Sequence, residues 1–159
     1  MLNIHILAVG SLKENWMSAA CAEYQKRIGA QFKLVVTELA EYRLPPAPSP
    51  AEICIGLQNE ALAFRKKMPP RAFTAALCIE GEQLASPDFA QLLERVSGKY
   101  PAVAFLIGGS HGLDEALKRE AHKRVSFSPM TFPHQFARVM LLEQLYRSGC
   151  IISGGKYHK

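Results

Sequence analysis

The sequence predicts an α/β fold in which a mostly parallel β-sheet carries helices on both faces. Short apolar runs rich in β-branched residues alternate with longer segments that have the periodicity of amphipathic helices, and this alternation is typical of strand–helix–strand units. The run at residues 102–107 is apolar at every position, as expected of a strand covered on both faces. Because 159 residues are enough to bury one core, we expect residues 1–159 to form a single domain.

The first third of the chain predicts two strands with a helix between them. Residues 2–9 and 32–39 are apolar and rich in β-branched side chains, which favours strands. Residues 13–28 have helical periodicity, and Gly29 follows them as a stop signal. We expect one face of this helix to be buried, made of Trp16, Ala19, Ala20, Tyr24 and Ile28.

A proline-rich segment follows the second strand, with four of the ten prolines between Pro45 and Pro50. Because proline has no backbone N–H and disfavours helix in the residue before it, we expect a stiff surface loop. A linker between two domains is the competing interpretation, although 44 residues are few for an independent domain. Residues 51–68 are then expected to form a helix that ends at Pro69 and Pro70.

The remaining elements continue the alternation. In the third helix we expect Ser86 to be the cap and Pro87 to occupy the first position. The expected ranges are a strand at 73–79, a helix at 86–97, a strand at 102–107, a helix at 113–122, a strand at 124–127 and a helix at 133–148.

Three glycines, Gly108, Gly109 and Gly112, connect the fourth strand to the helix after it. In parallel sheets, ligands bind beyond the carboxyl ends of the strands, where glycine lets the backbone approach closely. The spacing differs from the G-x-G-x-x-G of dinucleotide sites, and no GKS or GKT follows. A ligand site and a simple tight turn both remain open at this point.

The loop at residues 126–132, with the sequence SFSPMTF, offers backbone polar groups inside an apolar wall, which suits a planar ring. Core packing of its aromatic residues is the alternative. We expect Thr131 to cap the last helix and Pro133 to begin it. This helix is apolar on two sides, which predicts a homodimer interface. The two stripes are Phe136, Val139 and Met140, and Leu141, Leu142 and Leu145.

Positive charge is concentrated in the last part of the chain. Residues 1–117 carry a net charge of −1 and residues 118–159 carry +6, which favours a polyanionic partner, with a solvated helix face as the alternative. Glu143 is spaced to pair with Arg147, which leaves Arg138 available for a phosphate or a carboxylate. Tyr157 and His158 are suited to stacking on a base and to proton transfer, unless the terminus is simply frayed.

Other signals narrow the class of protein. The four cysteines contain no CxxC and the first residues lack a basic signal-peptide region, so we expect the cytoplasm. No apolar stretch approaches the roughly 20 residues of a membrane span, so we expect no membrane partner. The five histidines show no HExxH or paired spacing, so we expect no metal.

Taken together, several segments resemble one family along nearly the whole chain. The segments are ILAVGSLKENW, EYQKRI, FLIGGSHGL, FSPMTFPHQFARVMLLEQLYR and the terminal KYHK. They are similar to the ribosomal RNA large-subunit methyltransferase H family, which belongs to the SPOUT class of knotted methyltransferases. His111 departs from the family pattern, and we assign it no role. The Pro45–Pro50 loop departs as well, which leaves only local surface contacts in doubt.

The resemblance implies an α/β fold with a carboxyl-terminal trefoil knot, working as a homodimer. It implies methylation of N3 of a pseudouridine in large-subunit (23S) ribosomal RNA, on the assembled ribosome, with S-adenosyl-L-methionine as cofactor. It also implies cofactor contacts from Leu77, Gly108, Phe127, Ser128, Pro129, Met130, Thr131 and Phe132.

For catalysis we expect Arg138 to stabilise a phosphate or a developing anion and Tyr157 to stack on the substrate base. We expect His158 to act as a base or to position one. The competing hypothesis is a non-enzymatic ribosome- or RNA-binding module of the same fold, which would keep the basic tail and lack the cofactor site.

Overall fold

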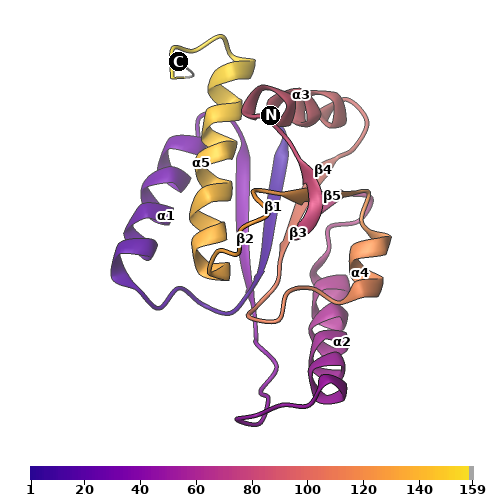
Figure 1. Cartoon of the computed structure of the whole chain (residues 1–159). Helices are drawn as coiled ribbons and strands as arrows, with labels where there is room; N and C mark the ends of the chain where they lie inside the picture. The colour runs from indigo at the N-terminus through magenta and orange to yellow at the C-terminus, as the bar shows by residue number, and fades with distance from the viewer. Residues whose placement is uncertain (158–159) are drawn as a thin grey trace.

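A five-stranded sheet forms the middle layer of the computed structural model, which describes residues 1–157 (Figure 1). The strand order is β2-β1-β4-β3-β5, and all neighbouring strands run parallel. The predicted α/β architecture with a parallel sheet is therefore confirmed. The strands are β1 (Asn3–Val9), β2 (Lys33–Leu39), β3 (Phe73–Gln83), β4 (Ala102–Ile107) and β5 (Lys123–Ser126).

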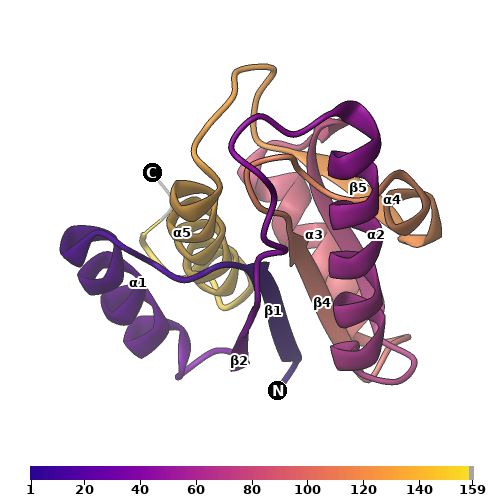
Figure 2. The same ribbon diagram turned by 90° about the horizontal axis from the view of Figure 1, so that it is seen from below.

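Helices cover both faces of the sheet. One face carries α1 (Asn15–Ile28), α3 (Ser86–Ser97) and α5 (His134–Ile152), and the other carries α2 (Pro50–Lys67) and α4 (Glu115–Glu120). Figure 2 shows α1 and α5 on one side of the strands and α2 and α4 on the other. Across residues 1–157, none of these helices combines the length and hydropathy that crossing a bilayer requires.

The interior strand β1 shows why the two faces of the sheet form separate cores. Its side chains alternate in direction, as in any strand. Ile4 and Ile6 therefore belong to the core under α1, α3 and α5, whereas Leu7 and Val9 belong to the core under α2 and α4. All four side chains are at most 1% exposed, as expected of a strand that lies between two neighbours, β2 and β4, and is covered on both faces.

Strand β3 is longer than predicted and changes register against β5. Val125 pairs with Leu77 and again with Glu82, with an irregularity between the two positions. A Cβ at Gly81 would lie 2.6 Å from the backbone carbon of Val125, closer than side-chain atoms approach. Only glycine lets the end of β3 pass this close to β5, and the passage places residues 77–80 beside the carboxyl end of the sheet. The knot itself stays a prediction.

The buried face of α1 differs from the predicted one. Met17, Cys21 and Ile28 are buried, whereas Trp16 is 55% exposed. The expectation that Trp16 and Ala19 belong to the buried face is wrong, because α1 packs on α5 through a stripe about one residue further round the helix. Trp16 instead lies 6.1 Å from the ring of Phe136, on the surface of the molecule.

Two predicted helix caps are also wrong. Ser86 is the first residue of α3 rather than its cap, and its hydroxyl donates to Oε1 of Gln144 on α5 at 2.7 Å. The cap position of α5 is Pro133, and no side chain caps this end, so Thr131 does not serve that purpose. The hydroxyl of Ser86 thereby joins α3 to α5.

The segment between β2 and α2, which includes the prolines, packs against α2 through its first residues. Ser49 caps α2 in a capping box with Glu52, and Pro50 occupies the first turn. A Cβ at Gly56 would lie 3.1 Å from the ring of Tyr42, so the loop and the helix pack closely. The backbone N–H of Tyr42 also donates to Oε1 of the buried Glu60 at 3.0 Å. These contacts hold the loop beside the carboxyl ends of the strands.

Candidate functional site

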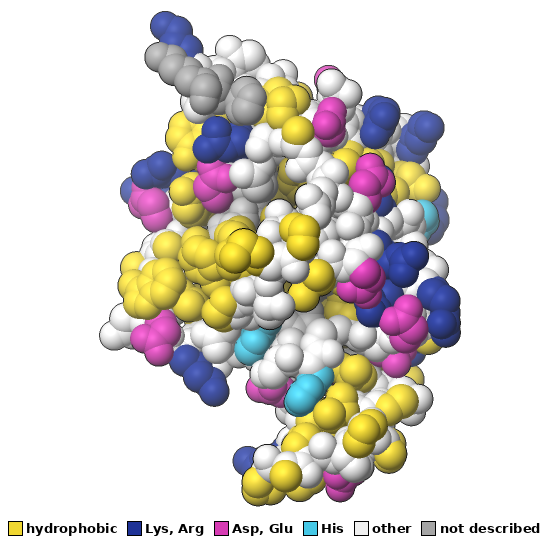
Figure 3. All heavy atoms as spheres, viewed as in Figure 1, with side chains coloured by type: hydrophobic (Ala, Val, Ile, Leu, Met, Phe, Trp, Pro, Cys, Tyr) yellow, Lys and Arg dark blue, Asp and Glu magenta, His cyan; other side chains and the backbone are white. Residues whose placement is uncertain are grey.

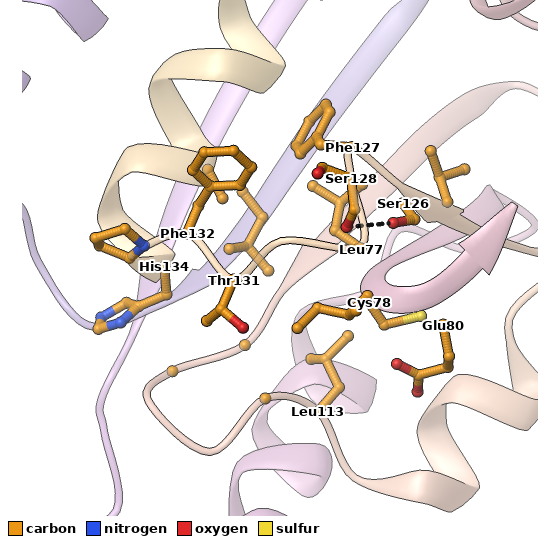
Figure 4. A pocket seen from close by; sticks show the side chains of 18 of the residues that line it. Leu77, Cys78, Glu80, Leu113, Ser126, Phe127, Ser128, Thr131, Phe132 and His134 are labelled. Atoms are coloured by element: carbon orange, nitrogen blue, oxygen red, sulfur yellow. Dashed lines mark hydrogen bonds between the residues drawn. The ribbon is translucent and has the colours of Figure 1, made fainter. Parts of the chain in front are cut away.

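The carboxyl ends of β3, β4 and β5 open into a cavity of about 820 Å³, a size that suits a small-molecule cofactor. Three segments form most of its wall, and the side chains converge from different elements (Figure 4). They are residues 77–80 at the end of β3, residues 107–113 after β4, and the chain from Val125 to His134 that joins β5 to α5.

The glycine loop, residues 108–112, forms one wall of this cavity and requires glycine at two positions. A Cβ at Gly108 would lie 2.2 Å from the carbonyl oxygen of Gly112. Gly112 itself has a φ of +79°, a conformation that other residues rarely adopt. Gly109 and Gly112 pair across the loop as an isolated β-bridge. The segment is thus both a tight turn and the wall of a cavity.

The 127–132 loop forms the opposite wall, and its shape is held by Ser126, which precedes it, and by Ser128. The hydroxyl of Ser126 donates to the carbonyl oxygen of Ser128 at 3.0 Å (Figure 4). The backbone N–H of Met130 donates to the hydroxyl oxygen of Ser128, also at 3.0 Å. These bonds curl the loop around the cavity before α5 begins at His134.

The expected cofactor contacts gather at this cavity, with one exception. The lining includes Leu77, Gly108, Phe127, Ser128, Met130, Thr131 and Phe132, whereas Pro129 is absent from it. Leu77 reaches the cavity because β3 ends beside the glycine loop. The residues that the resemblance implies for the cofactor, apart from Pro129, come from three separate segments and are therefore neighbours in space.

The sequence patterns did not assign several polar residues of the cavity wall to a site. Cys78, Glu80, His111, Lys118 and His134 all line the cavity. Lys118 donates to the carboxylate of Glu80, which lowers the pKa of Glu80, and it pairs with Glu115 at 2.8 Å. The signal that could have found Glu80 is the position of Gly81, which marks the passage of β3 over β5.

A second cavity, of about 440 Å³, adjoins the first and shares Phe127, Ser128, Phe132 and Met140 with it. The half-buried stripe of α5 lines this cavity with Phe136, Val139 and Met140. Over the amino-terminal ends of α1 and α5, hydrophobic side chains gather on the surface of the molecule (Figure 3). Trp16, Phe132 and Phe136 belong to this patch, with ring centroids 6.1 and 6.2 Å apart along the row.

Arg138 of α5 was predicted to be available for a phosphate or a carboxylate, but the chain encloses it. It is 2% exposed, and its Nη1 donates to Oε1 of Glu38 at 2.6 Å. Its Nη2 donates to the carbonyl oxygen of Gly10 at 3.0 Å. The expectation that Arg138 is available for a phosphate is wrong, because a carboxylate of this same chain occupies the guanidinium. The predicted pair of Glu143 and Arg147 does form, at 2.6 Å.

Tyr157 lies against α5, and it is absent from the wall of the first cavity. Its hydroxyl donates to Oε1 of Glu143 at 3.4 Å, and its ring meets that of Tyr146 edge-on at 4.7 Å between centroids. The guanidinium of Arg147 lies over the Tyr157 ring at 4.8 Å. His158 lies outside the described residues.

Among the described residues, no group of three or more His, Cys, Asp or Glu side chains could hold a metal ion.

Comparison with known proteins gives one consistent result. A family model described as "Predicted SPOUT methyltransferase" matches residues 2–158. A relative from Streptococcus equi subsp. zooepidemicus (strain MGCS10565), named "Ribosomal RNA large subunit methyltransferase H", is 43% identical over 159 residues, covering 99% of this chain and 100% of the relative. A relative of the same name from Clostridium botulinum (strain Kyoto / Type A2) is 41% identical over 160 residues, with the same coverage.

The fold also matches a solved structure. The crystal structure of a probable methyltransferase from Bordetella pertussis Tohama I superposes with a TM-score of 0.52 at 16% sequence identity, covering 93% of each chain. At this identity the likeness concerns the fold alone. It places the parallel sheet and its helices in the same architecture as that protein.

Proposed function

This chain belongs to the SPOUT methyltransferase family, and on that premise we propose that it methylates N3 of a pseudouridine in large-subunit (23S) ribosomal RNA. It is a methyltransferase, and its cofactor is S-adenosyl-L-methionine. Two relatives that are 43% and 41% identical over nearly the whole chain bear the name of a ribosomal RNA large-subunit methyltransferase. We further propose that the 159 residues act as one domain, in the cytoplasm and on the assembled ribosome.

The observation that carries this proposal is the cavity at the carboxyl ends of β3, β4 and β5. Its wall fits the cofactor, because Leu77, Leu113 and Phe127 offer apolar surface for an adenine ring. At Gly108 no side chain has room, so backbone polar groups stand directly at the cavity. We propose that Leu77, Gly108 and residues 127–132 hold the cofactor, with Pro129 shaping the loop from outside the wall.

S-adenosyl-L-methionine supplies an electrophilic methyl group when bound. The work left to the protein is to align the acceptor with this methyl group, to exclude water and to receive the imide proton of N3. The two loops on either side of the cavity perform the alignment. We propose that Tyr157 stacks on the substrate base and that His158 helps to position the group that accepts the proton. Arg138 positions α5 rather than contacting RNA.

A homodimer is part of the proposal. Phe136, Val139 and Met140 lie half-buried on the outer stripe of α5, and Trp16 and Phe132 continue this apolar surface. A row of aromatic and aliphatic side chains beside the cavity suits burial against a second copy. The net charge of +6 over residues 118–159 favours a polyanionic partner such as ribosomal RNA.

Methyl transfer to ribosomes tests the proposal. Ribosomes from a strain that lacks this modification are incubated with the protein and tritiated S-adenosyl-L-methionine, and the RNA is digested to nucleosides and separated by mass spectrometry. The expected product is N3-methylpseudouridine from 23S RNA, formed on assembled ribosomes and not on free 23S RNA. Large-subunit RNA without label would overturn the proposal. Failure to bind the cofactor in calorimetry would favour the RNA-binding module instead.

A further inference from the structure

His134 occupies the point where the wall of the cavity becomes a helix. It is the first residue of α5, it follows the 127–132 loop directly, and it lines the cavity. In Figure 4 it lies on the same side of the cavity as Thr131 and Phe132. A side chain at the start of a helix that is anchored in the core is held more firmly than one on a loop tip, which suits a group that must meet a substrate.

The nitrogens of the His134 ring are not engaged in hydrogen bonds within the described part of the chain. Among the described residues, neither of its nitrogens has a hydrogen-bond partner, although the side chain is half-buried. A Cβ at Gly10 would lie 3.7 Å from Nε2, so the ring faces the turn after β1. That turn is itself fixed by Arg138, which donates to the carbonyl oxygen of Gly10 at 3.0 Å.

The surroundings keep this imidazole neutral near physiological pH. Burial lowers the pKa of His134, the carboxylate of Glu41 after β2 opposes the shift, and the positive charges of Arg138 on α5 and Lys13 before α1 reinforce it. A neutral imidazole has a lone pair on one ring nitrogen and can therefore accept a proton.

The other described histidines do not share this combination. His122 is engaged by Thr74, whose hydroxyl lies 2.8 Å from Nδ1, and it stacks on Phe73. His5 belongs to β1 and is absent from the cavity wall. His111 also lines the cavity, but it is exposed on the glycine loop, where nothing fixes its ring.

We propose that His134 is the general base of the reaction, a role that rests on the function proposed above. As the bond between N3 and the methyl carbon forms, the bond between that carbon and sulfur breaks, and the sulfonium becomes a neutral thioether. The N3–H bond breaks and its proton passes to the free ring nitrogen of His134. The resulting imidazolium returns the proton to water after the product leaves. The substrate base must then reach the end of the cavity that His134 lines.

The test compares His134→Gln with His5→Gln, because burial also lowers the pKa of His5 but that residue lies away from the cavity. We expect H134Q to lower kcat on ribosomes by about 100-fold or more and H5Q to keep the wild-type rate. Both variants should bind S-adenosyl-L-homocysteine with wild-type affinity. Wild-type kcat for H134Q, or an equal loss in both variants, would overturn the assignment.

A second measurement uses the unaltered protein. Nuclear magnetic resonance of the imidazole signals gives the pKa of His134 in the free protein, and we expect it below the ordinary value. The wild-type rate in single turnover should fall at low pH, and H134Q should lack this fall. A wild-type rate without any acidic limb would also overturn the assignment. If the wild-type protein transfers no methyl group to ribosomes at all, the proposed function fails, and the titration still reports whether this histidine is neutral.

Discussion

The guanidinium of Arg138 joins the first turns of α5 to the carboxyl ends of β1 and β2, with a distance of 2.6 Å to Oε1 of Glu38. The two residues are unequal, because the side chain of Arg138 is 3% exposed and that of Glu38 is 47% exposed. Water therefore reaches the carboxylate but scarcely reaches the guanidinium. The pair fixes the turn at Gly10 against the helix that begins with His134.

This inequality predicts which partner matters more for stability. Glu38→Ala leaves a charged guanidinium buried without its partner, which we expect to lower the free energy of unfolding by about 2–3 kcal/mol. Arg138→Met leaves a carboxylate that water can solvate, and we expect a loss of about 1 kcal/mol. Urea denaturation of both variants measures the order, and a larger loss for R138M than for E38A would contradict it.

The same burial predicts how Arg138 affects the ribosome. A residue that contacts a phosphate contributes to the salt dependence of RNA binding. Since Arg138 is enclosed by its own chain, R138M should leave the salt dependence of ribosome association unchanged. Sedimentation with ribosomes at several salt concentrations checks this. A slope reduced by about one unit would return Arg138 to the role of a phosphate ligand.

Gly108 should be irreplaceable for cofactor binding. A Cβ there would lie 2.2 Å from the carbonyl oxygen of Gly112, so Gly108→Ala must displace the wall of the cavity. We expect its affinity for S-adenosyl-L-homocysteine to fall by about tenfold or more in calorimetry. Gly98→Ala is the matched control, because the nearest atom to its Cβ would be 4.0 Å away and the site is the end of α3. Equal affinities for G108A and G98A would argue against a cofactor contact at Gly108.

Glu60 should make stability depend on pH. Burial raises its pKa, against the N–H bond from Tyr42 that lowers it. As the pH rises, the carboxyl of Glu60 therefore loses its proton in the unfolded chain before it does so in the folded chain. The free energy of unfolding falls as the pH rises from the unfolded pKa to the folded pKa of Glu60, and this loss persists at higher pH. Glu60→Gln keeps an acceptor for Tyr42 and lacks the titration, so we expect it to be more stable than the wild type at pH 7 and equal to it near pH 4.

Glu60→Ala provides the contrast to this variant. It removes both the titrating carboxyl and the acceptor of the Tyr42 N–H, and we expect it to be about 1 kcal/mol less stable than E60Q at both pH values. Thermal unfolding across the pH range measures both variants. If E60Q and the wild type respond to pH in parallel, the carboxyl of Glu60 does not titrate as described.

The outer stripe of α5 should control assembly. Val139→Asp places a carboxylate on the half-buried face beside Phe136, and desolvating that charge opposes association. We expect a dimeric wild type and a monomeric V139D in light scattering at micromolar concentration. Ile55→Asp is the control, because Ile55 is a half-exposed apolar residue of α2 on the opposite layer. A monomeric wild type would refute the homodimer.

Regular patterns made much of the fold predictable. The six residues of β4 are all buried, and such a continuous apolar run has few interpretations other than a central strand. Both walls of the cavity were also predictable, because glycines and the SFSPMTF loop lie where parallel strands end. The last residues of β3 escaped prediction because they are polar, and pairing with β5 rather than hydrophobic burial makes them a strand.

The errors concern contacts between distant segments. Arg138 and Glu38 are 100 positions apart, and no periodicity within α5 indicates that a strand end supplies the partner. No spacing in the sequence indicates the role proposed for His134, because that role depends on the cavity that the side chain lines. Pairings of this kind follow from topology, which local sequence patterns do not specify.

Helix α5 has two apolar faces, one that packs on the sheet and one that lines the cavities. Leu141, Leu142 and Leu145 are fully buried and hold the helix to the sheet, whereas Phe136, Val139 and Met140 line the cavities. Because the two stripes alternate every three to four residues, substitutions on the outer one can accumulate without loosening the fold. Single substitutions on this outer stripe could therefore change which substrate or partner the protein binds, while the fold is kept.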